Sequence, residues 1–180
     1  MSRSPIVYLS PAVPARKRLC PDGTDAGELI ARYLDELCRS LTACGVAWQR
    51  NGTDLAGAAG VRRAVSESNA CGAALHYVVR TADGAGTGES VLLAAPEQLE
   101  SARALARSRA ELCTRKVRIH PCRDMYEMVY ANAPCLYEYI AAHENAADMR
   151  WLHHHTAQLA AATARVFCDI FRKNAHRIGA

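Results

Sequence analysis

The chain has 180 residues, of which 50% are hydrophobic and 22% are charged, a composition typical of one folded domain and not of a disordered or fibrous chain. Its 22 Lys and Arg exceed its 18 Asp and Glu, giving a net charge of +4, but the basic residues are scattered, which argues against a nucleic-acid-binding protein. No apolar run approaches the ~20 residues of a membrane-spanning helix and no signal peptide is recognisable, so we expect no membrane span.

The pattern of apolar residues alternates between strand and helix periods along the chain. In chain order it predicts a strand at 5–9, a helix from an N-cap at 24 or 25 to a terminating glycine at 45, a strand at 45–51, a helix at 53–68, strands at 73–80 and 90–95, a helix at 96–113, strands at 116–121 and 134–140, and a last helix running to about 173. This order predicts an α/β fold: a mostly parallel open sheet of about five or six strands with helices on both faces. We expect a single domain over 1–180.

Two segments of this order carry further expectations. The Gly-rich stretch 83–88 precedes a strand and not a helix, so we interpret it as a hairpin turn and not as a phosphate-binding loop. The arginines of the helix at 96–113 are interpreted as part of a solvated helix face.

Eight cysteines occur without a CxxC pair or zinc-finger spacing. Several stand where an apolar core residue belongs, as Cys135 and Cys168 do. We therefore expect free, mostly buried thiols and residence in a reducing cytoplasm.

The histidines offer candidate site residues. His153, His154 and His155 are consecutive on a predicted helix, so their side chains point about 100° apart and cannot face one ion together. His76 shares a strand face with Arg80 and is interpreted as a half-buried, hydrogen-bonded residue.

Six segments together resemble a known family. They are VYLSP, GTDAGE, GVAWQRN, VSESNA, ALHYVVRTAD and DMYEMVYANAPCLYEYIAAHENAADMRWL. In this order and spacing the sequence is similar to the N-acetylmuramoyl-L-alanine amidases, zinc-dependent cell-wall hydrolases, and most of all to their phage endolysin and clostridial branch. The resemblance covers about residues 5–172 and implies an open, mostly parallel sheet with flanking helices. It also implies one zinc ion on three protein ligands, and a glutamate as general base.

The positions that the resemblance assigns to this chemistry hold other residues here. The first ligand position falls on Val13, the second on Glu28 or Asp25, and the third on Arg80. The general-base position falls on Tyr139, or on Glu138 with a shift of one residue, which in a strand moves a side chain to the opposite face. Neither an aliphatic side chain nor a guanidinium offers a lone pair to zinc.

We therefore expect no zinc cofactor and a non-catalytic amidase-fold protein that binds peptidoglycan fragments or a protein partner. Glu28, His76, Arg80 and Glu138 are the candidate ligand-binding residues. Arg80 is expected either to pair with Glu28 or to bind an anion such as a carboxylate of a cell-wall peptide.

The alternative is an active zinc-dependent peptidoglycan amidase with relocated ligands. Its ligands and base would be drawn from His76, His120, His143, Glu28 and Glu138. On either hypothesis, contact with the cell wall is expected if the protein is released as phage lysins are. The sequence does not fix the oligomeric state.

Overall fold

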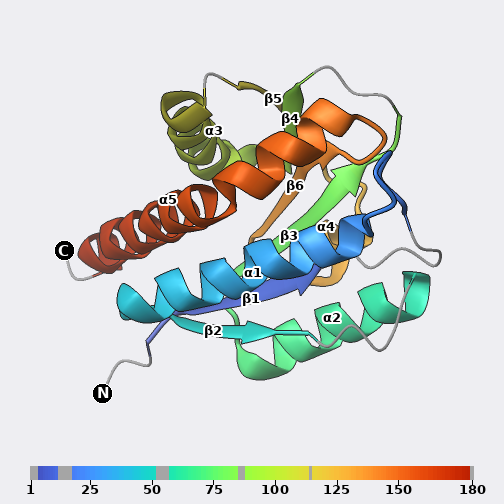
Figure 1. Cartoon of the computed structure of the whole chain (residues 1–180). Coiled ribbons are helices and arrows are strands. Elements are labelled where there is room, and N and C mark those ends of the chain that lie inside the picture. Colours follow the sequence, from blue (N-terminus) through green and yellow to red (C-terminus); the bar gives the residue numbers. More distant parts are fainter. Residues whose placement is uncertain (1–3, 12–17, 52–56, 85–87, 114, 179–180) are drawn as a thin grey trace.

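The structure, a computed structural model, describes residues 4–11, 18–51, 57–84, 88–113 and 115–178. Figure 1 shows the course of the chain. The elements are β1 (Ile6–Pro11), α1 (Ala26–Ala43), β2 (Ala47–Arg50), α2 (Gly57–Cys71), β3 (Leu75–Ala82), β4 (Glu89–Ala94), a 3₁₀ turn η1 (Pro96–Gln98), α3 (Leu99–Cys113), β5 (Lys116–Pro121), α4 (Tyr126–Tyr130), β6 (Cys135–Ala142) and α5 (Ala146–Ile178).

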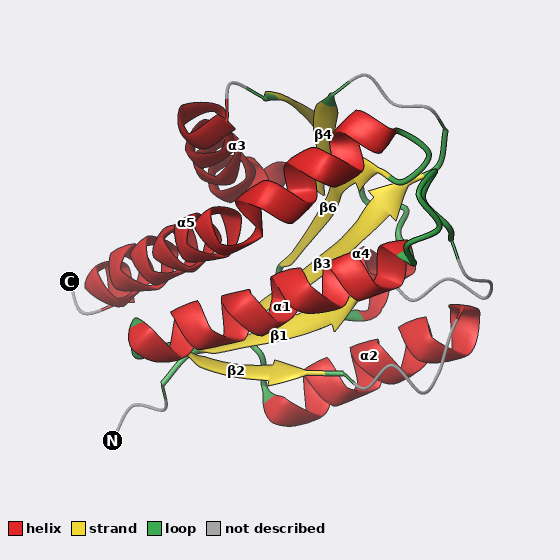
Figure 2. Ribbon diagram, viewed as in Figure 1, coloured by secondary structure: helices red, strands yellow, loops and turns green. Residues whose placement is uncertain are grey.

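The six strands form one sheet in the order β2-β1-β3-β6-β4-β5 (Figure 2). All neighbouring pairs are parallel except β4 and β6, so β4 and β5 run opposite to the other four strands. The predicted mostly parallel α/β sheet is confirmed. The predicted hairpin at 83–88 is wrong because β6 lies between β3 and β4, and residues 85–87 lie outside the described residues.

The two faces of the sheet are covered differently. One face carries the main core, in which apolar residues of α1, α3 and α5 pack on the strands. The other face carries a smaller cluster of Val78, Cys135 and Tyr137 beneath Met125 and Met128, next to and within α4. On that face the hydroxyl of Tyr8 in β1 donates to Glu67 of α2 over 2.6 Å, so α2 also covers this side.

The structure bears on two further expectations from the sequence, those on free cysteines and on membrane-spanning helices. The seven cysteines whose side chains the structure describes are all free. No helix within the described ranges is long and apolar enough to cross a membrane.

The first helix begins and ends at the residues that the sequence predicts. Asp25 is the N-cap, and its side chain accepts a hydrogen bond from the Gly27 backbone N–H over 2.8 Å. Gly45, just after the helix, has a φ of +71°, a left-handed conformation that L side chains rarely adopt.

We therefore expect Gly45→Ala to lower the free energy of unfolding by about 1 kcal/mol. An added Cβ would meet no atom within 4 Å, so the cost comes from the backbone conformation alone. Urea unfolding followed by circular dichroism measures it. Unchanged or increased stability would contradict this explanation of where α1 ends.

Candidate functional site at the carboxyl ends of the strands

The candidate site lies at one edge of the sheet. β1, β3 and β6 are parallel, so their carboxyl ends meet there, and the antiparallel β4 and the adjacent β5 begin there. In open α/β sheets this carboxyl edge is the usual place for ligands. Two positions that the family resemblance assigns to chemistry, those of Arg80 and Tyr139, lie near it.

Arg80 and Tyr139 lie next to each other on the adjacent strands β3 and β6. They are register partners in the β3–β6 ladder, and the guanidinium carbon of Arg80 lies 5.5 Å from the centroid of the Tyr139 ring. Arg80 Nη1 also donates to the Tyr137 hydroxyl over 3.3 Å, and the rings of Tyr137 and Tyr139 are 5.3 Å apart. Burial raises the pKa of the Tyr137 hydroxyl above its usual value, so this group remains a neutral hydrogen-bonding partner. The half-buried guanidinium of Arg80 is therefore held by two tyrosines, through a hydrogen bond to Tyr137 and a cation–π contact with Tyr139.

A second arginine reaches the same place from the loop after β1. Arg18 Nη1 donates to the Thr81 carbonyl oxygen over 3.0 Å, and Arg80 Nε lies 3.4 Å from that same oxygen. Arg18 pairs with Asp83 over 3.0 Å. Within the part of the chain that the structure describes, no carboxylate lies at ion-pair distance from Arg80, and the expected pair with Glu28 is not formed. Two guanidinium groups thus share one carboxylate, which leaves an excess of positive charge.

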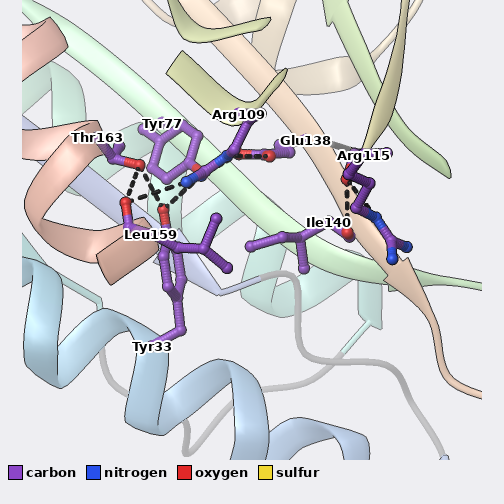
Figure 3. A network of polar contacts seen from close by, with 9 residues as sticks. Tyr33, Tyr77, Arg109, Arg115, Glu138, Ile140, Leu159 and Thr163 are labelled. Atoms are coloured by element: carbon purple, nitrogen blue, oxygen red, sulfur yellow. Dashed lines mark hydrogen bonds and ion pairs between the residues drawn. The ribbon is translucent and has the colours of Figure 1, made fainter. Parts of the chain in front are cut away.

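Glu138 lies in the main core, where Figure 3 shows it beside Arg109. It is fully buried and receives hydrogen bonds from Arg109 Nε and Nη2, each over 3.1 Å, and from the Tyr77 hydroxyl. Arg109 also donates to the Leu159 carbonyl oxygen over 3.0 Å and to the Tyr33 hydroxyl over 2.9 Å. Because its carboxylate is fully enclosed in this network, Glu138 cannot contact a ligand at the surface unless the core opens.

An irregularity in β6 does not bring Glu138 to the site face. The register shifts between Arg80 and Thr81, where Tyr139 and then Ala141 are the partners, so Ile140 is the extra residue. The shift lies after Tyr139. The alternation along the strand therefore leaves Tyr139 facing Arg80 and Glu138 facing the core.

His76 is also inaccessible, and its environment differs from the expected one. It is fully buried, its ring lies 5.1 Å from the Tyr8 ring, and neither ring nitrogen has a hydrogen-bond partner among the described residues. Burial lowers the pKa of this imidazole from 6.5 to about 4. The expectation of a half-buried, hydrogen-bonded histidine is therefore wrong, because the ring is completely buried beside Tyr8 with no polar partner among the described residues.

The remaining candidate residues are dispersed. Glu28 is exposed in the first turn of α1, where Asp25 serves as the N-cap. His120 lies near the end of β5, which points away from the carboxyl edge. His143 follows β6 at the edge, and its Nδ1 lies 2.7 Å from the Ala82 carbonyl oxygen. Val13 lies outside the described residues.

These donors do not fit the zinc site of the family. Among the described residues no group of three His, Cys, Asp or Glu is arranged to hold a metal ion. Residues 12–17, which follow β1, read AVPARK and contain none of these four residue types. This stretch, in which the resemblance places the first ligand at Val13, therefore offers no such donor.

Two features near the candidate site could not be recognised from the sequence pattern. Arg18 belongs to a loop rich in Pro and Arg, and nothing in its local sequence indicates that it would meet Arg80. The second is a buried ion pair near the edge: Arg115 pairs with Asp148 over 2.9 Å and lies 4.0 Å from the Trp151 ring centroid. Asp148 also accepts from the Ala142 backbone N–H over 2.8 Å, which fixes the end of β6 to the start of α5.

Comparison with solved structures identifies the fold. No family model and no curated protein sequence matches this chain. The chain is similar to the N-acetylmuramoyl-L-alanine amidase AmiC2 of Nostoc punctiforme, with a TM-score of 0.78 and 13% identity over 96% of this chain and 99% of that one. It is also similar to an N-acetylmuramoyl-L-alanine amidase of Clostridium difficile, with a TM-score of 0.81 and 10% identity over 95% and 98% of the two chains. For Ami1 of Mycobacterium smegmatis the TM-score is 0.77 and the identity 16%, over 92% and 95%.

Proposed function

We propose that this chain, which has the fold of the N-acetylmuramoyl-L-alanine amidases, is a binding protein for carboxylate-bearing peptidoglycan fragments and not a zinc hydrolase. The observation that carries the proposal is the environment of Arg80. Its half-buried guanidinium lies against Tyr137 and Tyr139, next to Arg18, and no carboxylate among the described residues is at ion-pair distance from it.

The chemistry of arginine supports an anionic ligand. A guanidinium stays protonated and presents its N–H donors in a fixed fork that matches a carboxylate with two parallel hydrogen bonds. Because Arg80 is partly withdrawn from water and held by the tyrosines, less side-chain freedom is lost on binding. The edge of the sheet is thus prepared for a carboxylate.

The same residues argue against hydrolysis. Arginine at the third ligand position of the family cannot coordinate zinc, and tyrosine at the general-base position replaces a carboxylate. The relocated set of His76, His120, His143, Glu28 and Glu138 is spread over different elements and both faces of the sheet. His76 and Glu138 would each have to leave the core to take part.

We expect N-acetylmuramoyl-L-alanine with a free carboxylate to bind the protein, and Arg80→Gln to weaken this binding by about tenfold, the usual value of one charge-assisted hydrogen-bonding group. Isothermal titration at low ionic strength measures both affinities. Replacing the carboxylate of the ligand by a carboxamide is expected to weaken its binding to the wild type at least as much. The affinity of the wild type for the carboxamide should therefore not exceed that of Arg80→Gln for the free acid.

The matched control is Arg103→Gln, which removes an exposed arginine of α3 that pairs with Glu100. It is expected to leave binding unchanged. A suspension of purified cell walls given this protein and zinc is expected to keep its turbidity. Clearing of the walls, or equal affinities of wild type and Arg80→Gln for the free acid, would overturn the proposed function.

A further inference from the structure

Four side chains form one row across the sheet, starting at Arg80. Arg80 is the register partner of Tyr139 in β6, Tyr139 is the partner of Val91 in β4, and Val91 is the partner of Arg118 in β5. Register partners lie on the same face of a sheet, so these four side chains share the face opposite the main core. The row begins and ends with an arginine and has an aromatic and an aliphatic residue between them.

The two ends of the row repeat one arrangement of charge. At one end Arg18 and Arg80 stand beside a single carboxylate, Asp83. At the other end Arg118 and Lys116 share Glu89, at 2.7 and 3.2 Å. Among the described residues, each end therefore has two cations and one carboxylate in an ion pair.

The middle of the row is less polar and only partly covered. Tyr139 and Val91 are both half-buried. Tyr137 and Leu93 form the neighbouring row, two residues away from Tyr139 and Val91 along β6 and β4. They pack beneath Met125, which precedes α4, and Met128, which lies in it. Glu127 of α4 is a further carboxylate on this side; it is buried, and burial raises the pKa of this carboxyl while the positive charge of Arg80 lowers it.

We propose that this row binds an extended peptide that carries two carboxylates, one held at Arg80 and the other at Arg118. This rests on the proposed function and names the ligand class more closely. Neighbouring strands lie about 4.8 Å apart, so three steps across the sheet separate the two arginines by about 14 Å. An extended peptide advances about 3.3 Å per residue and alternates its side chains, so acids four positions apart lie about 13 Å apart on one face.

The ligand therefore has acidic groups at positions i and i+4 with small apolar or hydroxyl side chains between them. The first carboxylate meets the guanidinium that already lies on Tyr139. The second competes with Glu89 for Arg118, which binds that carboxylate through Nε and Nη2 over 2.7 and 3.0 Å and whose side chain is 52% exposed. Acids at adjacent positions point to opposite faces of the peptide and cannot reach both arginines.

The test compares three end-capped pentapeptides by isothermal titration at low ionic strength. The first has Asp at positions one and five around Thr-Val-Thr, the second replaces the last Asp by Asn, and the third moves the second Asp to position two. We expect the first peptide to bind about tenfold more tightly than either of the others, because only it makes both charge-assisted contacts. In Arg118→Gln this gain is expected to disappear.

Arg123→Gln is the matched control, since Arg123 is an exposed arginine that pairs with Glu97 outside the row; it should preserve the gain. An equal affinity for the first and third peptides, or a gain that persists in Arg118→Gln, would overturn the proposal that the row binds two carboxylates of one peptide. If, in that case, Arg80→Gln still weakens the binding of the one-acid peptide, the proposed function stands and only the contact with Arg118 is refuted. If Arg80→Gln changes the affinity for none of the three peptides, the row does not bind acidic peptides; the proposed function fails as well only if Arg80→Gln also leaves the affinity for N-acetylmuramoyl-L-alanine unchanged.

Discussion

Replacement of Arg109 by leucine is expected to lower the free energy of unfolding by about 3–5 kcal/mol, the largest effect that we expect of a single substitution in this chain. Arg109 and Glu138 are both fully buried, so the change leaves the Glu138 carboxylate in the core without its partner. It also removes the donors to the Leu159 carbonyl and the Tyr33 hydroxyl. Urea unfolding at neutral pH, followed by circular dichroism, measures the loss.

Arg103→Leu provides the control on the same helix. Arg103 pairs with Glu100 at the surface of α3, so its loss is expected to cost less than about 0.5 kcal/mol. A graded variant, Tyr33→Phe, removes only the hydroxyl that joins Arg109, Tyr77 and Thr163 and is expected to cost about 1 kcal/mol. If Arg109→Leu were as stable as Arg103→Leu, the buried network would not be the feature that joins α3 to β6.

The second large effect is a dependence of stability on pH that comes from His76. The pKa of this imidazole is about 4 in the folded protein against 6.5 in the absence of burial. Between these values the unfolded chain binds a proton that the folded protein does not, so lowering the pH favours unfolding. The loss begins below pH 6.5, is complete below about pH 4, and amounts to about 3 kcal/mol.

His76→Leu is expected to remove this contribution. The difference in unfolding free energy between the wild type and His76→Leu should change by about 3 kcal/mol from neutral pH to pH 4. Carboxylates that titrate in the same range do so in both proteins and cancel in the difference. His153→Leu, at an exposed position of α5, is the control for replacing a histidine by leucine. A pH-independent difference for His76→Leu would show that the imidazole is not held neutral by burial.

The elements with strong local signals could be predicted from the sequence. α1 combines an aspartate N-cap, apolar residues at helical spacing and a terminating glycine with positive φ. The strand order and the reversed direction of β4 could not be predicted, because strand pairing depends on tertiary contacts and not on local pattern. The five-residue helix α4 could not be predicted either, since one and a half turns give no readable period.

The core network corrects the interpretation of the α3 arginines as a solvated face. Arg109 follows Ala102 and Leu105 at helical spacing, and all three residues are completely buried. A lone arginine on an apolar helix face requires a buried carboxylate partner. The alternation of β6 offers Glu138 as that partner, on the face opposite Tyr137 and Tyr139, so this part of the core does carry a signal in the sequence.

The candidate site could be predicted in part. The resemblance places Arg80 and Tyr139 at two chemical positions of one family, and the structure makes them register partners with their side chains in contact. Their contact with Tyr137 and the approach of Arg18 depend on how β3 and β6 pair and on the course of the loop after β1. Neither can be derived from local sequence.

A crystal structure of the protein soaked with both zinc and the free acid of N-acetylmuramoyl-L-alanine tests the central claim most directly. We predict electron density for a carboxylate on the guanidinium of Arg80, within hydrogen-bonding distance of its N–H donors, and no metal ion at the carboxyl ends of β1, β3 and β6. A tetrahedral metal ion held there by nitrogen and oxygen donors of the protein would contradict the account.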